Sequence, residues 1–198
     1  MAVLVSGCSW SRQGPGANGY VSGDGTVRMI PARDRGEPIT LTGRDLTGAK
    51  LSAPSASDRP TVVNIWWSGC AECREEAATL RAAALDETVS ADFFGIDVRE
   101  SGRPQAQRFV EHFGIPFRSF YDPGGSLLLQ LHHTVPYSAI PTTVVLDNRG
   151  RPAAVILGTV PSVTTLRDLV ADVDGAPRES SSTTKTALVA EEGVQQGG

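Results

Sequence analysis

The chain has 198 residues, with 18 Lys and Arg against 22 Asp and Glu, for a formal net charge of −4 at pH 7. That length suits one domain of ordinary size with tails. The acidic balance argues against a nucleic-acid platform, because phosphate binding needs clustered cations. No apolar run approaches the roughly 18 residues that a membrane-spanning helix needs. Three cysteines are too few for a disulfide scaffold, so their placement carries the information.

The two ends of the chain differ in composition from the rest. Residues 8–26 are rich in Gly and Ser without an apolar period, which predicts a flexible tether. Residues 175–198 are mostly polar and predict a disordered tail, because they cannot bury enough apolar surface to offset the entropy of ordering. The folded domain is therefore expected over residues 27–174.

Strand and helix signals alternate inside this domain. Apolar runs and helical spacings predict these elements in chain order: a strand over 61–67, a helix over 73–84, a strand over 93–98, a helix over 104–113, a short strand over 117–121, a short helix over 126–131, a hairpin with strands 142–146 and 153–157, and a closing helix over 163–173. This order indicates a three-layer α/β domain with a mixed central sheet.

Cys70 and Cys73 are separated by two residues and lie just after the first of these strands, at the start of a helix. The first turn of a helix has unpaired N–H groups and the positive end of the helix dipole. Both stabilise a thiolate, which is the nucleophile in disulfide exchange. Cys70 is therefore the candidate nucleophile, and Cys73, one turn further on, is the candidate resolving thiol.

Three structural interpretations of the pair stay open. A zinc site would need two further ligands, and Cys8, His112, His132 and His133 offer no paired ligand spacing. An inert disulfide would close too short a loop to stabilise the fold much. The third interpretation is two unrelated core cysteines. Under the redox interpretation no metal and no organic cofactor is expected, because the dithiol carries the electrons.

The run 63–76, VNIWWSGCAECREE, resembles the active-site segment of the TlpA/ResA-like thioredoxin family. The resemblance covers nearly all of residues 37–173, including the DNRG turn at 147–150. The segment between Phe93 and Leu131 is similar to the strand and helix that this family adds to plain thioredoxin. The resemblance implies a thioredoxin fold, three-layer α/β/α with a mixed central sheet, an N-terminal extension and that central strand–helix insertion.

The resemblance also implies roles for individual residues. The bond between Ile140 and Pro141 would be cis and would face the cysteines, so that the backbone of Ile140 pairs with an extended substrate. Pro141 by itself fits an ordinary trans proline at the start of a strand. Glu76 would exchange protons with the thiol of Cys73, and the alternative is a solvated carboxylate on the helix surface.

The sequence departs from the family pattern at two positions. Gly69 stands where a Trp usually precedes the first cysteine, although Trp66 and Trp67 are close by. Glu72 stands where a Pro usually precedes the second cysteine, and its charge is expected to raise the pKa of the thiol. Ala71, Glu72 and the two Trp residues are therefore expected to tune the redox potential. The direction of the chemistry stays open.

The segment Leu4–Cys8, LVSGC, resembles a bacterial lipobox, which implies that Cys8 is lipidated and anchors the chain outside the cell membrane. Two acyl chains would give stable attachment. Only seven residues precede Cys8, and none is Lys or Arg. Residues 1–7 are therefore interpreted as the remnant of a signal peptide that begins further upstream. The alternative is a cytosolic protein with a chance cysteine.

The expected function is thiol–disulfide oxidoreductase activity outside the cytoplasmic membrane. The resemblance implies that the protein reduces apocytochrome c or other exported thiol proteins, with electrons from a membrane dithiol donor. One alternative is a peroxiredoxin-like thiol peroxidase, although Trp67 stands where such enzymes place a Thr or Ser. The other is a non-catalytic copper-binding lipoprotein that joins His132 and His133 to the cysteine pair.

Overall fold

The computed structural model describes residues 26–53, 56–136 and 138–175. The predicted signal remnant, Cys8, nearly all of the tether and nearly all of the tail lie outside the described residues. The elements are β1 (Val27–Met29), β2 (Leu41–Arg44), β3 (Lys50–Ala53), β4 (Thr61–Trp66), α1 (Ala71–Leu85), β5 (Asp92–Asp97), α2 (Arg103–Phe113), β6 (Ser119–Tyr121), η1 (Leu128–Leu131), β7 (Thr142–Leu146), β8 (Pro152–Leu157) and α3 (Val163–Asp174).

The central sheet has six strands in the order β1-β8-β7-β4-β5-β6. Strand β4 pairs parallel with β5 and antiparallel with β7, so the sheet is mixed. Every residue of β4 is buried, as expected for an apolar strand covered on both faces. The predicted α/β class with a mixed central sheet is confirmed, and so is the hairpin of β7 and β8.

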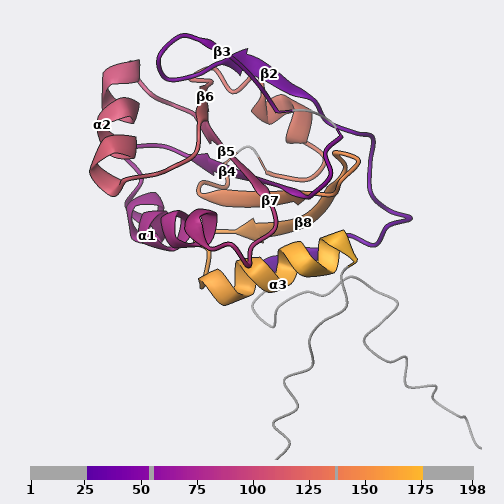
Figure 1. Cartoon of the computed structure of the whole chain (residues 1–198). Helices are drawn as coiled ribbons and strands as arrows, with labels where there is room; N and C mark the ends of the chain where they lie inside the picture. Colours follow the sequence, from indigo (N-terminus) through magenta and orange to yellow (C-terminus); the bar gives the residue numbers. More distant parts are fainter. Residues whose placement is uncertain (1–25, 54–55, 137, 176–198) are drawn as a thin grey trace, which may run out of the picture.

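The three helices lie along one face of this sheet (Figure 1). Leu80 of α1 and Leu166 of α3 belong to the same buried cluster as Val62 and Ile156 of the sheet. Helix α2 packs beside α1 at the end of β4, where Trp66 contacts Phe109. The active-site helix is therefore supported by the sheet below it and by a helix on each side.

The other face of the sheet is covered by the β2–β3 hairpin and by η1 (Figure 1). A helix over 126–131 was expected here, but the structure has only the 3-10 turn Leu128–Leu131. The carboxylate of Asp122 caps this segment by accepting the backbone N–H groups of Ser126 and Leu127, and the bonds that follow it, such as Gln130 N–H to the carbonyl oxygen of Leu127, close the tighter three-residue turn. Among the described residues, no helix is both long and apolar enough to cross a bilayer.

Candidate active site

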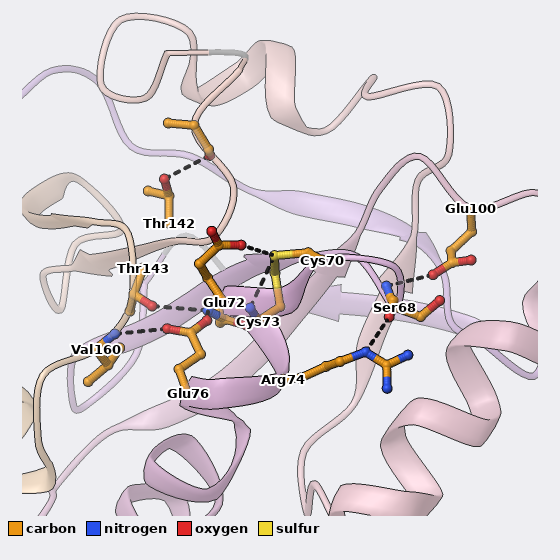
Figure 2. The surroundings of a disulfide bond; sticks show 12 residues. Ser68, Cys70, Glu72, Cys73, Arg74, Glu76, Glu100, Thr142, Thr143 and Val160 are labelled. Atoms are coloured by element: carbon orange, nitrogen blue, oxygen red, sulfur yellow. Dashed lines mark hydrogen bonds between the residues drawn. A yellow bond between two sulfur atoms is a disulfide. The ribbon is translucent and has the colours of Figure 1, made fainter.

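The two cysteines lie between the end of β4 and the start of α1, where they form a disulfide with Cα atoms 5.3 Å apart (Figure 2). Cys70 is the N-cap residue of α1, and its Sγ accepts the backbone N–H of Cys73 at 3.1 Å. Cys70 is 8% exposed and Cys73 is 2% exposed. An external sulfur therefore has better access to Cys70, whose thiolate the helix N-terminus would stabilise.

The turn before Cys70 is held from two sides. Glu100 Oε1 accepts the backbone N–H of Ser68 at 2.8 Å, and Arg74 Nε donates to the carbonyl oxygen of Ser68 at 3.2 Å. The N–H of Cys70 donates to the carbonyl oxygen of Trp67 at 3.1 Å. These bonds fix the approach of the chain to the disulfide. The local sequence pattern gave no sign of Glu100, which lies in the loop after β5.

Glu76 is on the buried side of α1, one turn after Cys73, and only 2% of it is exposed. Its Oε1 accepts Asn64 Nδ2 at 2.8 Å, and its Oε2 accepts the N–H of Val160 at 2.9 Å. Burial raises the pKa of Glu76 to about 7, outweighing the two hydrogen bonds, which lower it. Burial rules out the alternative of a solvated surface carboxylate.

Asn64 is a functional candidate that sequence reasoning missed. Besides Glu76, its Nδ2 reaches Thr143 Oγ1 of β7 at 3.1 Å. The available signal was a carboxamide inside the apolar strand β4, because such a group requires a buried partner. Asn64 and Cys73 both line a cavity of about 10 Å³, roughly the space of one water molecule. Glu76 is therefore hydrogen-bonded to Asn64, which lines the same cavity as Cys73.

The two tryptophans have different surroundings. Trp66 is buried, stacks on Phe109 with ring centroids 4.5 Å apart, and donates from Nε1 to Ser119 Oγ at 3.3 Å. The ring of Trp67 covers Gly69, where an added Cβ would lie 2.6 Å from Cζ2 of the indole. Trp67 therefore fills the space that a side chain at position 69 would need. This explains why Gly69 replaces the aromatic residue expected there.

The residues between the cysteines, Ala71 and Glu72, form the exposed first turn of α1. Glu72 Oε2 lies 3.8 Å from the Sγ of Cys70. A carboxylate at that distance disfavours the thiolate of Cys70, whereas the helix dipole favours it.

The peptide bond between Ile140 and Pro141 is cis, and β7 begins at the next residue, Thr142. Ile140 packs against the buried cluster that contains Cys70 and Cys73. The predicted backbone-binding segment and the cysteine pair are therefore neighbours in the fold. A client bound at the cysteine pair would therefore lie next to Ile140 and Pro141.

Asp97, the last residue of β5, is a second buried carboxylate that sequence reasoning missed. It is fully buried, and neither side-chain oxygen has a hydrogen-bond partner among the described residues. Burial, reinforced by the charges of Glu100 and Asp122, raises the pKa of Asp97 to about 8. The available signal was an Asp at the end of an apolar strand, where a charge is costly.

The histidines of the copper alternative lie elsewhere. His132 and His133 have ring centroids 3.6 Å apart and line a groove with Arg28 and Val155. Across the described ranges, no group of three or more His, Cys, Asp or Glu side chains is arranged to hold a metal ion. The structure therefore does not bring these histidines to the cysteine pair.

A CxxC disulfide at the N-terminus of a helix, supported by a mixed sheet and followed across the site by a cis-proline, defines a thiol–disulfide oxidoreductase of the thioredoxin superfamily. The pair therefore carries redox chemistry and is neither an inert crosslink nor two unrelated core residues. The chain belongs to the Redoxin family, whose profile matches residues 31–172.

Solved structures of similar proteins agree with this assignment. A DsbF homologue from Corynebacterium diphtheriae is 32% identical, with a TM-score of 0.67, over 78% of this chain and 98% of that one. A secreted thiol-disulfide isomerase from Corynebacterium glutamicum is 30% identical, with a TM-score of 0.68, over 79% and 98%. A secreted Mycobacterium tuberculosis disulfide oxidoreductase, homologous to E. coli DsbE, is 25% identical, with a TM-score of 0.56, over 67% and 95%. No curated protein matches the chain.

Proposed function

We propose that the protein is a reductase of the TlpA/ResA type that acts on disulfides of exported proteins, such as apocytochrome c, outside the cytoplasmic membrane. The observation that supports reduction of clients, rather than their oxidation, is the 3.8 Å contact between Glu72 Oε2 and the Sγ of Cys70. A negative charge there disfavours the thiolate and so destabilises the reduced protein. A couple whose reduced form is less stable is the stronger reductant.

The reaction proceeds by two exchanges. The thiolate of Cys70 attacks one sulfur of the client disulfide, which forms a Cys70–client disulfide and releases the other client sulfur as a thiolate. Cys73 then loses its proton and attacks the Sγ of Cys70, which breaks the mixed disulfide and releases the second client thiolate. Two electrons have passed to the client, and the protein holds the disulfide seen in the structure. A membrane dithiol donor reduces the pair again by the reverse steps.

Glu76 is the proposed proton acceptor for Cys73. A general base is most effective when its pKa lies near the working pH, and burial brings the pKa of Glu76 to about 7. Glu76 lies one turn after Cys73 on the buried side of α1, which supports proton exchange between its carboxyl group and the thiol of Cys73. The clamp for the client backbone is Ile140 beside Pro141, which adjoins the cysteine cluster.

The location outside the membrane is supported by the similar proteins of C. glutamicum and M. tuberculosis, which are described as secreted. The lipobox-like run Leu4–Cys8 supports a lipid anchor on Cys8. Mass spectrometry of native protein extracted from membranes is expected to find acyl chains on Cys8 at the mature N-terminus. An unmodified Cys8 within a longer N-terminal peptide would contradict the anchor and leave the redox assignment intact.

The reduction potential of the Cys70–Cys73 couple tests whether the protein reduces or oxidises its clients. It is measured by equilibration with glutathione buffers, followed by alkylation of the free thiols. We expect a value nearer the thioredoxin end, about −270 mV, than the DsbA end, about −120 mV. Glu72→Gln should raise the potential by about 20 mV, because it removes roughly 1 kcal/mol of charge repulsion. Glu75→Gln is the matched control on the same exposed surface of α1. A wild-type value near the DsbA end would mean a disulfide-forming enzyme.

A further inference from the structure

A groove of about 340 Å³ runs beside the active-site turn. Ser68 and Arg74 form the wall next to the cysteines, and Arg108 and His112 of α2 form the opposite wall. Ser68 is two residues before Cys70, and Arg74 is in the first turns of α1. The groove therefore lies beside the turn that leads into Cys70, and none of the roles assigned above uses it.

The walls of the groove are cationic, although the chain as a whole has a net charge of −4. Arg74 and Arg108 are both exposed, and no Asp or Glu is among the described residues that line the groove. The hydrogen bond from Arg74 Nε to the carbonyl oxygen of Ser68, 3.2 Å long, holds one guanidinium at the rim. Arg108 has no ion-pair partner among the described side chains. The two guanidinium groups thus offer donors to a carboxylate.

The floor of the groove is aromatic and continuous with the core below the active site. Phe109 is 4.5 Å from Trp66 and 4.7 Å from Phe113, measured between ring centroids, and Phe113 is 4.7 Å from the ring of His112. Phe109 is buried and Phe113 is half-buried. These ring contacts tie the floor of the groove to the core below the active site. The apolar surface also suits the aliphatic part of an extended peptide.

We propose that this groove binds client segments that carry an Asp or Glu side chain close to the reactive cysteine. Figure 2 shows Ser68 and Arg74 on one side of the disulfide and Thr142 and Thr143 on the other. The disulfide thus lies between the groove wall and the start of β7 (Figure 2). A client segment that crosses the disulfide from Ile140 would extend toward the groove with its sulfur at Cys70. The inference rests on the proposed exchange with client disulfides, and it adds the chemistry by which clients are selected.

The test uses two cyclic disulfide peptides that differ only in Glu or Gln beside one cysteine. The measured quantity is the second-order rate constant for their reduction by the reduced full-length protein. The acidic peptide should react about fivefold faster at low salt, a preference that salt weakens, because one exposed ion pair is worth up to roughly 1 kcal/mol. Arg108→Glu should abolish the preference, because it leaves one positive wall at Arg74 and one negative wall opposite it.

The matched control is Arg167→Gln, which changes an arginine of α3 and should keep the preference for the acidic peptide. Equal rates for the Glu and Gln peptides would overturn the proposed groove while leaving the exchange activity established. An unchanged preference in the Arg108→Glu protein would overturn it as well. Failure to reduce either peptide would count against the proposed function itself.

Discussion

At the residue scale, Glu76 shows how burial changes the chemistry of one side chain. A glutamate carboxyl group in water has a pKa near 4.5, and burial between α1 and β4 raises the pKa of Glu76 to about 7. The N–H groups of Asn64 and Val160 stabilise the charged form, but desolvation is the larger effect. The carboxyl group is therefore close to half-ionised at neutral pH, which suits proton exchange with a thiol.

Glu76→Gln should slow the resolving step and change its pH dependence. In the wild type, the rate at which Cys73 resolves a mixed disulfide should rise with pH through about 7, as Glu76 becomes a base. In the variant that rise should disappear, and the rate at pH 7.5 should fall about 100-fold or more. Stopped-flow fluorescence measures the step. Glu75→Gln, on the exposed side of α1, serves as the control. If the Glu76→Gln protein kept the pH profile of the wild type, Glu76 would not be the base that accepts the proton of Cys73.

The sequence offered Cys70 and Cys73 as candidates through their spacing at the start of a helix, and it offered Glu76 only through the family resemblance. It was not sufficient to select Asn64 or Asp97. Their importance depends on what faces them from other strands and helices, and one sequence does not specify those partners. A polar residue in an apolar strand is a useful warning that a buried partner exists, although it does not identify that partner.

At the element scale, the start of α1 depends on a close contact between Trp67 and Gly69. Any side chain at position 69 would place a Cβ 2.6 Å from the indole of Trp67. Atoms cannot approach so closely, so the ring or the turn would have to move. Because the same turn leads into Cys70, a shift there would also move the nucleophile.

Gly69→Ala should destabilise the protein by about 1–3 kcal/mol, the usual cost of overpacking. Trp67→Ala in the same chain should restore most of that loss, because it removes the ring that the methyl group strikes. Denaturant unfolding of the two single variants and the double variant measures this coupling. Gly124→Ala is the matched control, since an added Cβ there meets nothing within 4 Å. Additive effects of the two changes would show that the contact is not the cause.

The elements that pattern reasoning located correctly are those with strong local periodicity, such as β4 and α2. The helix expected over 126–131 is only the 3-10 turn η1, in which bonds such as that from the N–H of Gln130 to the carbonyl oxygen of Leu127 span three residues. The pairing of β1 with β8 joins segments far apart in the chain. Such long-range pairing depends on tertiary packing, which local patterns do not encode.

At the scale of the whole molecule, the buried carboxylates set how stability depends on pH. The raised pKa values of Glu76 and Asp97 mean that the folded protein binds these protons more tightly than the unfolded chain. Their stabilising effect is complete below about pH 4 and is lost as the pH rises through about 7 and about 8. Asp45 acts in the opposite direction, because its bond with Arg118 lowers its pKa to about 2. Stability should therefore be greatest in mildly acidic solution.

Asp97→Asn should flatten this pH dependence. Between pH 5 and pH 8 the wild type should lose about 1.4 kcal/mol per pH unit for each such carboxylate, and the variant should lose less. The stability of the variant relative to the wild type should thus increase by about 4 kcal/mol over that range. Urea unfolding at several pH values measures it. Asp168→Asn, at an exposed carboxylate, should leave the slope unchanged, and parallel curves for Asp97→Asn would contradict the assignment.

The most direct measurement is trapping of the mixed disulfide. Reduced Cys73→Ser protein is mixed with a disulfide peptide and the adduct is located by mass spectrometry. We expect a stable adduct on Cys70, because the sulfur that would resolve it is missing, and no adduct with Cys70→Ser, because the buried Cys73 is 2% exposed. Equal adduct yields in the two variants, or equal exchange rates, would contradict the assignment of Cys70 as the nucleophile and Cys73 as the resolving thiol.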